Sequence, residues 1–264
     1  MPIMFRALWQ YRHFVISSIR NEFTTRFARS KFGGLWAIFN PLTQVTIYAL
    51  IFSNILQAKM AGIDSTYSFA IYLTAGFLCW NLFNEIVSRC LNVFIANGNL
   101  IKKATFPKIV LPATIVGTCL IDNLLLFVAI LLVFAVLGHA PGIEIVWLPL
   151  LVFATVALAV GIGLILGILN VFVRDIAQLV PIILQILFWF TPIIYPISII
   201  PEKYQTYLYL NPIFPLVKAY QDILVFEVAP DIVSIFSILL ASLGLLLAGL
   251  FLFFRANEEM ADVL

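Results

Sequence analysis

The residues of this chain that could do chemistry are few, and their spacing fits no enzyme. His13 and His139 are too isolated to be metal ligands, and no Ser/His/Asp arrangement is visible. No Gly-x-x-x-x-Gly-Lys-Ser/Thr stretch is present, so the chain cannot by itself cradle the phosphates of ATP in such a loop. We therefore expect no catalytic residue, no metal site and no cofactor in this chain.

Three ionisable residues lie inside long apolar stretches, where a charge is costly and usually marks function. Glu85 and Arg89 are four positions apart, in the order that favours an ion pair on one helix face, so we expect each to satisfy the other. Asp122 has only Asn123 beside it and would either face a wet cavity or be protonated. A proton relay would need a chain of such groups. The three cysteines also lie in apolar stretches and indicate small buried side chains.

These groups must be positioned by a very apolar chain. Apolar residues make up 63% of the chain and charged residues 11%. In a soluble domain, apolar residues make up about 45–50% and charged residues about 25%. The excess falls in runs long enough to cross ~30 Å of hydrocarbon. Backbone groups in lipid must be satisfied within the segment, and the runs lack the apolar/polar alternation of a barrel, so we predict an all-α integral membrane protein. The net charge of +2 suggests no nucleic acid partner.

Six transmembrane helices are predicted. They cover residues 34–56, 68–95, 109–137, 147–172, 179–195 and 232–254. Eleven of the fifteen Lys and Arg residues fall on one side of this layout and three on the other. Because cytoplasmic loops carry the excess of positive charge, both termini are expected in the cytoplasm. The chain then divides into an N-terminal segment (1–33), the six-span domain (34–254) and a cytoplasmic tail (255–264).

The N-terminal segment reads as an amphipathic helix, not as a signal peptide, because residues of mixed character precede the first apolar run. Its apolar residues fall on a stripe about 120° wide at 100° per residue, which Arg12 and Arg26 interrupt. The stripe consists of Leu8, Trp9, Val15, Ile16, Ile19, Phe23 and Phe27. We expect this helix to lie at the cytoplasmic interface. The alternative is a basic flank that only sets the topology.

The connection between the fifth and sixth predicted spans, 197–230, is long and rich in proline. Its pieces are too short to span but amphipathic, with tyrosines that suit a membrane interface. We predict a re-entrant, extracytoplasmic hairpin of two short helices that caps a pathway, since irregular backbone at that depth needs protein or water around it. A flat surface loop is the alternative.

Several short motifs resemble the membrane subunits of ABC-2-type polysaccharide exporters. The stretch RFARSKFGGLWAIFNPL (26–42) is similar to the R-Y-x-x-S-x-L-G-x-x-W-x-x-x-x-P-L entry to that family's first span, with Phe27 and Phe32 in place of tyrosine and leucine. Four more stretches follow in the family's order: FPKIVLP, NVFVRDI, TPIIYP and NPIFPLVKAYQDIL. The resemblance covers nearly the whole chain, and the nearest pattern is that of Wzm-type O-antigen permeases.

The resemblance implies a set of partners. Such a permease works in the bacterial inner (plasma) membrane as a homodimer with two separate ATPase subunits, which bind ATP and Mg. It exports a polyprenyl-diphosphate-linked glycan. Segment 97–108 looks like the coupling helix that docks on the ATPase, and Arg174 with Asp175 would form a second contact or a local ion pair. The other residues expected at the ATPase contact are Asn97, Lys102, Lys103, Phe106 and Pro107. The alternative is that these lysines only enforce topology.

A glycan path should combine aromatic platforms with few strong charges. Residues of the first predicted span fall near one helix face, and further aromatic residues lie near the ends of other spans. The first group is Trp36, Phe39, Asn40, Thr43 and Tyr48; the second is Trp80, Trp189 and Tyr195. Aromatic belts at the membrane interface are the alternative explanation. One chain encloses too little room for a polysaccharide, so we expect the path at a two-fold axis.

Other functions compete with O-antigen export. Teichoic acid and capsule exporters share most of the motifs. A secondary carrier would usually show broken helices at matched positions in two halves, and the Gly and Pro interruptions here are not matched. A structural scaffold would not need the proline-bracketed basic segment after the second span.

Overall fold

The regular structure of the described residues is entirely helical, as the sequence predicts. The computed structural model describes residues 9–27, 32, 36, 39, 43, 46–47, 68–103, 107–136, 138–139, 141–256 and 259–263. Most of the predicted first span, 34–56, lies outside these residues, as do Asn40, Tyr48 and Phe106.

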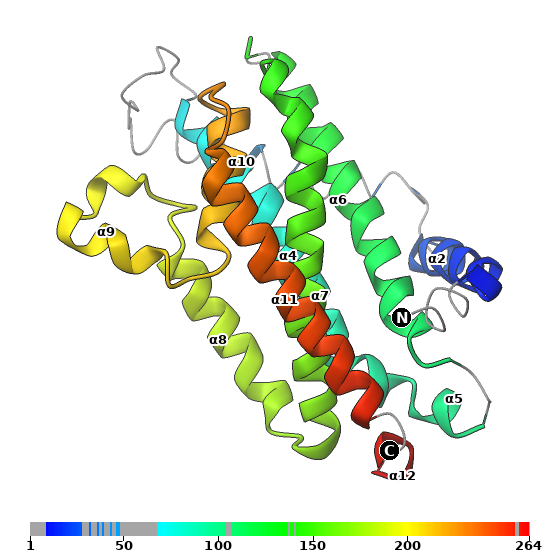
Figure 1. Ribbon diagram of the computed structural model, residues 1–264. Helices are drawn as coiled ribbons and strands as arrows, with labels where there is room; N and C mark the ends of the chain where they lie inside the picture. Colours follow the sequence, from blue (N-terminus) through cyan, green and yellow to red (C-terminus); the bar gives the residue numbers. More distant parts are fainter. Residues whose placement is uncertain are drawn as a thin grey trace.

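Four helices of the described chain are long and apolar enough to cross a membrane. They are α4 (Ser68–Ala96), α6 (Val110–Val136), α7 (Leu148–Phe172), which the 3-10 helix η2 (Ile143–Trp147) precedes, and α11 (Ile232–Ala256). They correspond to the second, third, fourth and sixth predicted spans, with ends that agree to within two residues. Figure 1 shows them side by side as one bundle.

The fifth predicted span is shorter and begins earlier than expected. Helix α8 runs over Ile176–Phe190 and has 15 residues, about 22 Å of helix at 1.5 Å per residue. It ends because Thr191 is extended, with φ −97° and ψ 127°, the backbone region that a residue before proline prefers. The TPIIYP stretch is therefore an irregular segment that follows the helix, and the sequence boundary at residue 195 is wrong.

The two short helices of the 197–230 connection are not equivalent. After the 3-10 turn η3 (Ile197–Ile199), helix α9 (Glu202–Leu208) has mostly exposed side chains. Helix α10 (Phe214–Leu224) is embedded, and Leu216, Val217 and Tyr220 are fully buried. Figure 1 shows α9 projecting from the bundle while α10 lies within it. Only α9 has the exposure that a mobile cap would need.

Glycine allows the central helices to approach closely. A Cβ atom added at Gly161 of α7 would lie 2.6 Å from the backbone of Leu245 in α11, and one at Gly249 would lie 2.7 Å from the carbonyl oxygen of Gly161. On α7's other contact, a Cβ atom at Gly167 would lie 2.5 Å from the carbonyl oxygen of Cys90 in α4. The closely spaced glycines of GIGLILG (161–167) therefore serve helix packing, and α7 forms the centre of the bundle.

Helix α2 (Arg12–Phe27) lies against α6, and its predicted apolar stripe is divided between two surroundings. The side chain of Ile19 packs against Gly117 of α6. A Cβ atom added at Gly117 would overlap the Cδ1 atom of Ile19. Trp9 and Ile16, on the other edge of the stripe, are 71% and 61% exposed. One edge of the stripe thus packs on the bundle, and the other is left to face its surroundings.

The glycine contact gives a prediction with an internal control. Gly161→Ala should lower the thermal stability of the detergent-purified protein, because overpacking against backbone costs about 1–3 kcal/mol. Gly244→Ala in α11 has no atom within 4 Å of the added Cβ, and should be neutral or stabilising by up to about 1 kcal/mol, since alanine favours a helix. Loss of the monodisperse chromatographic peak on heating measures both variants. Equal melting of the two would contradict the close contact.

Candidate functional site

A groove of about 480 Å³ opens between α4 and α8. Its aromatic lining comes from Phe77, Trp80 and Phe188. Its polar lining consists of Asn81, Asn84, Ser88 and Gln185. All of the polar groups are neutral, so the groove offers hydrogen-bond donors and acceptors beside rings without a fixed charge.

The polar row of the groove follows from its spacing on α4. Asn81, Asn84 and Ser88 recur at i, i+3 and i+7, which places them on one face of a helix. Inside a membrane, such a face must turn toward protein or a wet space, and the groove provides it. This row was not among the predicted site residues, although three neutral polar residues at helical spacing in an apolar span were a readable signal.

The aromatic wall of the groove is a packed cluster. The ring centroids of Trp80 and Phe188 are 5.3 Å apart, and those of Phe77 and Phe188 are 5.5 Å apart. Trp80 also contacts Phe83 and is only 5% exposed. It therefore supports the wall from inside the core, while Phe77 and Phe188, which are partly buried, offer more of their rings.

The other predicted path residues, at the end of α8 and just after it, lie apart from the groove lining. Trp189 is 57% exposed and meets Phe188 edge-on. The hydroxyl of Tyr195 donates to the carbonyl oxygen of Trp189 at 2.8 Å, which ties the irregular segment to the end of α8. Neither residue lines the groove.

The described residues of the first predicted span form an exposed aromatic row. Trp36 and Phe39 are 40% and 49% exposed, with ring centroids 6.5 Å apart, and Phe32 lies 6.0 Å from Trp36 in the same way. Thr43 is exposed as well. The structure therefore brings the rings of Trp36 and Phe39 together, with both side chains partly exposed in the single chain.

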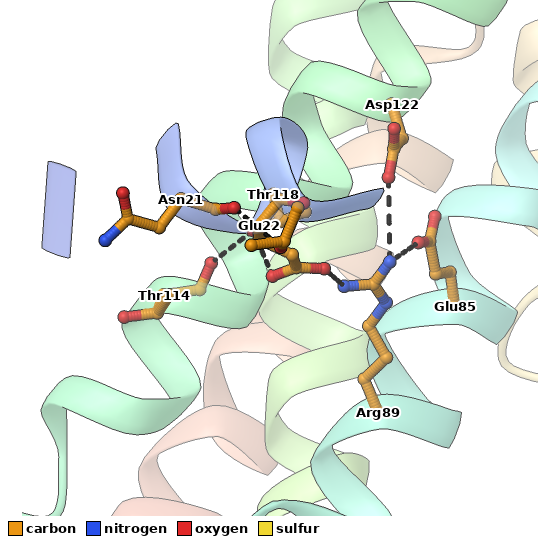
Figure 2. Close-up of polar contacts among 8 residues, drawn as sticks. Asn21, Glu22, Glu85, Arg89, Thr114, Thr118 and Asp122 are labelled. Atoms are coloured by element: carbon orange, nitrogen blue, oxygen red, sulfur yellow. Dashed lines mark hydrogen bonds and ion pairs between the residues drawn. The ribbon is translucent and has the colours of Figure 1, made fainter. Parts of the chain in front are cut away.

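A second polar site surrounds Arg89 on a neighbouring face of α4 (Figure 2). One guanidinium nitrogen lies 2.5 Å from a carboxylate oxygen of Glu22 in α2. The other lies 2.7 Å from Glu85, one helical turn away, and 3.6 Å from Asp122 in α6. The second oxygen of Glu22 accepts from the hydroxyl of Thr118 in α6 at 3.1 Å. The Arg89 cluster, which we define as these five residues, thus joins α2, α4 and α6.

The Arg89 cluster confirms one expectation and corrects another. Glu85 and Arg89 do pair along one helix face. Asp122 was expected to face a wet cavity or to be protonated, and instead it lies in an ion pair with Arg89. The sequence could not show this pair because Asp122 and Arg89 lie in different spans, and the order of residues says nothing about which spans become neighbours.

The segment after α4 turns sharply and continues as the six-residue helix α5 (Gly98–Lys103). The side-chain amide of Asn97 donates to the carbonyl oxygen of Val93 at 2.8 Å, so Asn97 closes the end of α4. Lys102 points outward, as does Leu100, which is 39% exposed. Leu100, which the sequence analysis had not singled out, is the exposed apolar side chain of α5.

Two further residues predicted at the ATPase contact lie at the turn between α7 and α8. Arg174 and Asp175 are both exposed, and no ion pair joins these two described side chains, so the local ion pair considered above is wrong. Pro107 begins the turn into α6, where its carbonyl oxygen accepts from the amide of Val110 at 3.0 Å. Figure 1 shows α5 and the α7–α8 turn at the same end of the bundle.

The site contains no recognisable metal centre in the part of the chain that the structure describes. No three or more His, Cys, Asp or Glu side chains of these residues come together in a group that could hold a metal ion. The ring of His139 lies 2.8 Å from the carbonyl oxygen of Leu224, at the end of α10. The three cysteines are free and buried, as expected.

Four apolar helices of membrane-spanning length in the described chain indicate a multi-pass membrane protein. The family model for the ABC-2 type transporter matches residues 14–225. The chain belongs to that family, and the resemblance seen in its motifs is confirmed at the family level.

Relatives of similar length carry specific names. The chain is 29% identical to the O-antigen export system permease protein RfbA of Myxococcus xanthus over 259 residues, 97% of each chain. It is 28% identical to an RfbA of Klebsiella pneumoniae over 248 residues, 92% of each. It is also 29% identical to the polysialic acid transport protein KpsM of Escherichia coli over 242 residues, which are 90% of this chain and 91% of that one.

The Arg89 cluster makes a prediction about α2. Glu22→Gln keeps the shape of the side chain but removes the charge that faces Arg89. The backbone amides of α2 should therefore exchange with solvent faster, by about tenfold for each ~1.4 kcal/mol by which the free energy of opening α2 falls. Hydrogen exchange of the protein in nanodiscs measures this. Arg20→Gln, an exposed change on the same helix, is the control and should leave the exchange unchanged. If the two variants behave alike, the Glu22–Arg89 pair does not hold α2.

Proposed function

We propose that this chain is the membrane-spanning permease subunit of an ATP-driven exporter that moves a lipid-linked polysaccharide of the O-antigen type across the bacterial inner membrane. The observation that carries the proposal is the α4–α8 groove, where rings and neutral amides lie side by side. The names of relatives that match this chain over nearly its whole length support the same substrate class.

The chemistry of the groove suits a moving sugar chain. A polysaccharide has apolar C–H faces and polar edges, so it needs rings to slide along and weak hydrogen-bond partners in register with them. A hydrogen bond between neutral groups contributes only about 0.5–1.5 kcal/mol net, whereas a charged partner would hold a passing sugar more tightly. Asn81, Asn84 and Gln185 meet this requirement. The charged residues of α4, Glu85 and Arg89, lie on the neighbouring face, where they belong to the Arg89 cluster.

The path requires a second copy of the chain. The groove between α4 and α8 is open on one side, and the face of α8 turned away from it exposes Ile182, Ile183 and Ile186 by between 53% and 57% in the single chain. A two-fold partner would cover part of this surface and enclose the groove, and closed two-fold pairs are the commonest homo-oligomers. The exposed row of Trp36, Phe39 and Thr43 would complete the wall from the first span, together with Asn40 and Tyr48.

Energy would come from two separate ATPase subunits that bind ATP and Mg. Helix α5 presents Leu100 and Lys102 outward, an apolar anchor beside a charge, and Lys103 and Phe106 would extend this contact. Arg174 and Asp175 at the α7–α8 turn would form a second contact at the same end of the bundle. The positive charge near these segments supports a cytoplasmic location for that end, and both termini would lie there.

The membrane arrangement completes the proposal. The first predicted span and α8 would bring the number of spans to six, with TPIIYP carrying the fifth through the rest of the outer leaflet. Helix α2 would lie at the cytoplasmic interface with Trp9 and Ile16 in contact with lipid. On the outer side, α9 would be the movable part of the hairpin at 197–230, and α10 its fixed base.

Capsular polysaccharide is the second candidate substrate, because KpsM, named for polysialic acid transport, matches 90% of this chain; teichoic acid export remains a further alternative. These substrates differ in their sugars and in their lipid anchor. Accumulation of a lipid-linked glycan inside cells that lack this subunit, followed by analysis of its sugars, separates the three.

The groove gives a direct test of the path. Asn84→Leu and Gln185→Leu should each slow export of the glycan several-fold, because each removes hydrogen-bond partners and narrows the groove. Assembly and basal ATP hydrolysis should persist. Ser237→Leu on the exposed face of α11 is the matched polar-to-apolar control and should export normally. Normal export by both groove variants would contradict the proposed path.

A further inference from the structure

We propose that the C-terminal helix α12 (Glu259–Val263) is a brace that fixes the position of α5, with Met260 and Ile101 as positioning residues. The role of α5 as the ATPase contact rests on the proposed function above. The brace itself is argued from packing alone.

Helix α12 is docked on the bundle by one fully buried side chain. Met260 is 0% exposed, although α12 has only five residues. It belongs to an apolar cluster at this end of the bundle, which also holds Ile101 of α5, Phe253 of α11 and Val171 of α7. Helix α12 contacts both α5 and α7, and Figure 1 shows α12 and α5 at the same end.

Helix α5 needs such support because it is short. Isolated helices below ~12–15 residues are marginal in water, so packing must provide their stability. Ile101 is 6% exposed, whereas Asn99, Leu100 and Lys102 are exposed. Among the described side chains of α5, Ile101 is thus the buried anchor. It packs in the same apolar cluster as Met260.

The brace determines which helices would respond when α5 is displaced. Through the covalent chain, α5 is continuous with α4 and leads into α6. Through Met260, it is also joined to α7 and to the end of α11, which pack on each other at Gly161 and Gly249. A movement imposed on α5 by an ATPase would therefore reach the whole bundle and not only the two helices that flank it.

The test uses the full-length protein in nanodiscs, alone and with its ATPase subunits. Met260→Asp should release α12, because a carboxylate without a partner is costly in an apolar cluster. We expect amide exchange at Leu100–Lys103 to rise at least tenfold and the affinity for the ATPase subunits to fall by a similar factor. Val263→Asp, at a position 49% exposed on the same helix, should change neither, and Met260→Leu should restore both.

The two readouts separate the brace from the proposed function. Unchanged exchange of the α5 amides in Met260→Asp would overturn the brace, whatever the ATPase subunits do. Faster exchange with unchanged ATPase affinity would overturn the positioning role of Met260. Failure of the unaltered protein to bind any ATPase subunit would instead contradict the proposed function, while the exchange of α5 would still decide whether α12 holds it. If Met260→Asp failed to fold, amide exchange would be faster throughout α7. In that case Ile101→Ala, which changes the apolar cluster less, would be measured in its place.

Discussion

The cost of placing polar groups in hydrocarbon determines how the rest of this structure is arranged. Helix α4 carries more polar side chains than any other of the four long helices, and each must have a partner or a wet surface. They divide into two neighbouring faces. Asn81, Asn84 and Ser88 turn toward the α8 groove, while Glu85 and Arg89 turn toward α2 and α6. The first face is neutral and open; the second is charged and paired.

This division assigns different tasks to the two sides of α4. The charged face is structural, because Arg89 binds a carboxylate from each of α2, α4 and α6 and so determines where the N-terminal helix lies. Removing one partner of such a group is expensive, since the remaining charge is left partly buried. The neutral face is free of that demand, and in the proposed exporter its side chains would change hydrogen-bond partners as the substrate passes.

The packing of the bundle separates a rigid centre from exposed surroundings. Helices α4, α7 and α11 meet through glycines at distances that leave no space for a Cβ atom, and α10 is buried among α4 and α7. In contrast, α9 and the outer face of α8 are exposed. In the proposed exporter, changes of the path would therefore occur at α8, α9 and the first span, against a fixed wall formed by α4.

Local patterns in the sequence predicted the features that depend on local physics. Apolar runs indicated α4, α6, α7 and α11 with accurate ends, and the glycines of α7 indicated close packing. The boundary of α8 was missed because length was judged by apolar character, while Pro192 ends the helix before the apolar run does.

Contacts between distant segments were out of reach of the same reasoning. The pairing of Glu22 with Arg89, the burial of α10 compared with α9, and the docking of Met260 beside Ile101 all depend on which helices become neighbours. The row of Asn81, Asn84 and Ser88 is different, because its spacing was visible and only its significance was overlooked.

The central claim is that the glycan passes along the neutral face of α4. A photo-cross-linking amino acid at position 84, in cells that produce the lipid-linked glycan and contain an ATPase subunit slowed in hydrolysis, tests it most directly. The same amino acid at position 240, where Leu240 is 74% exposed on α11, is the control. We predict a glycan adduct on the permease at position 84 and none at position 240. Adducts of equal yield at both positions, or at position 240 alone, would contradict the account.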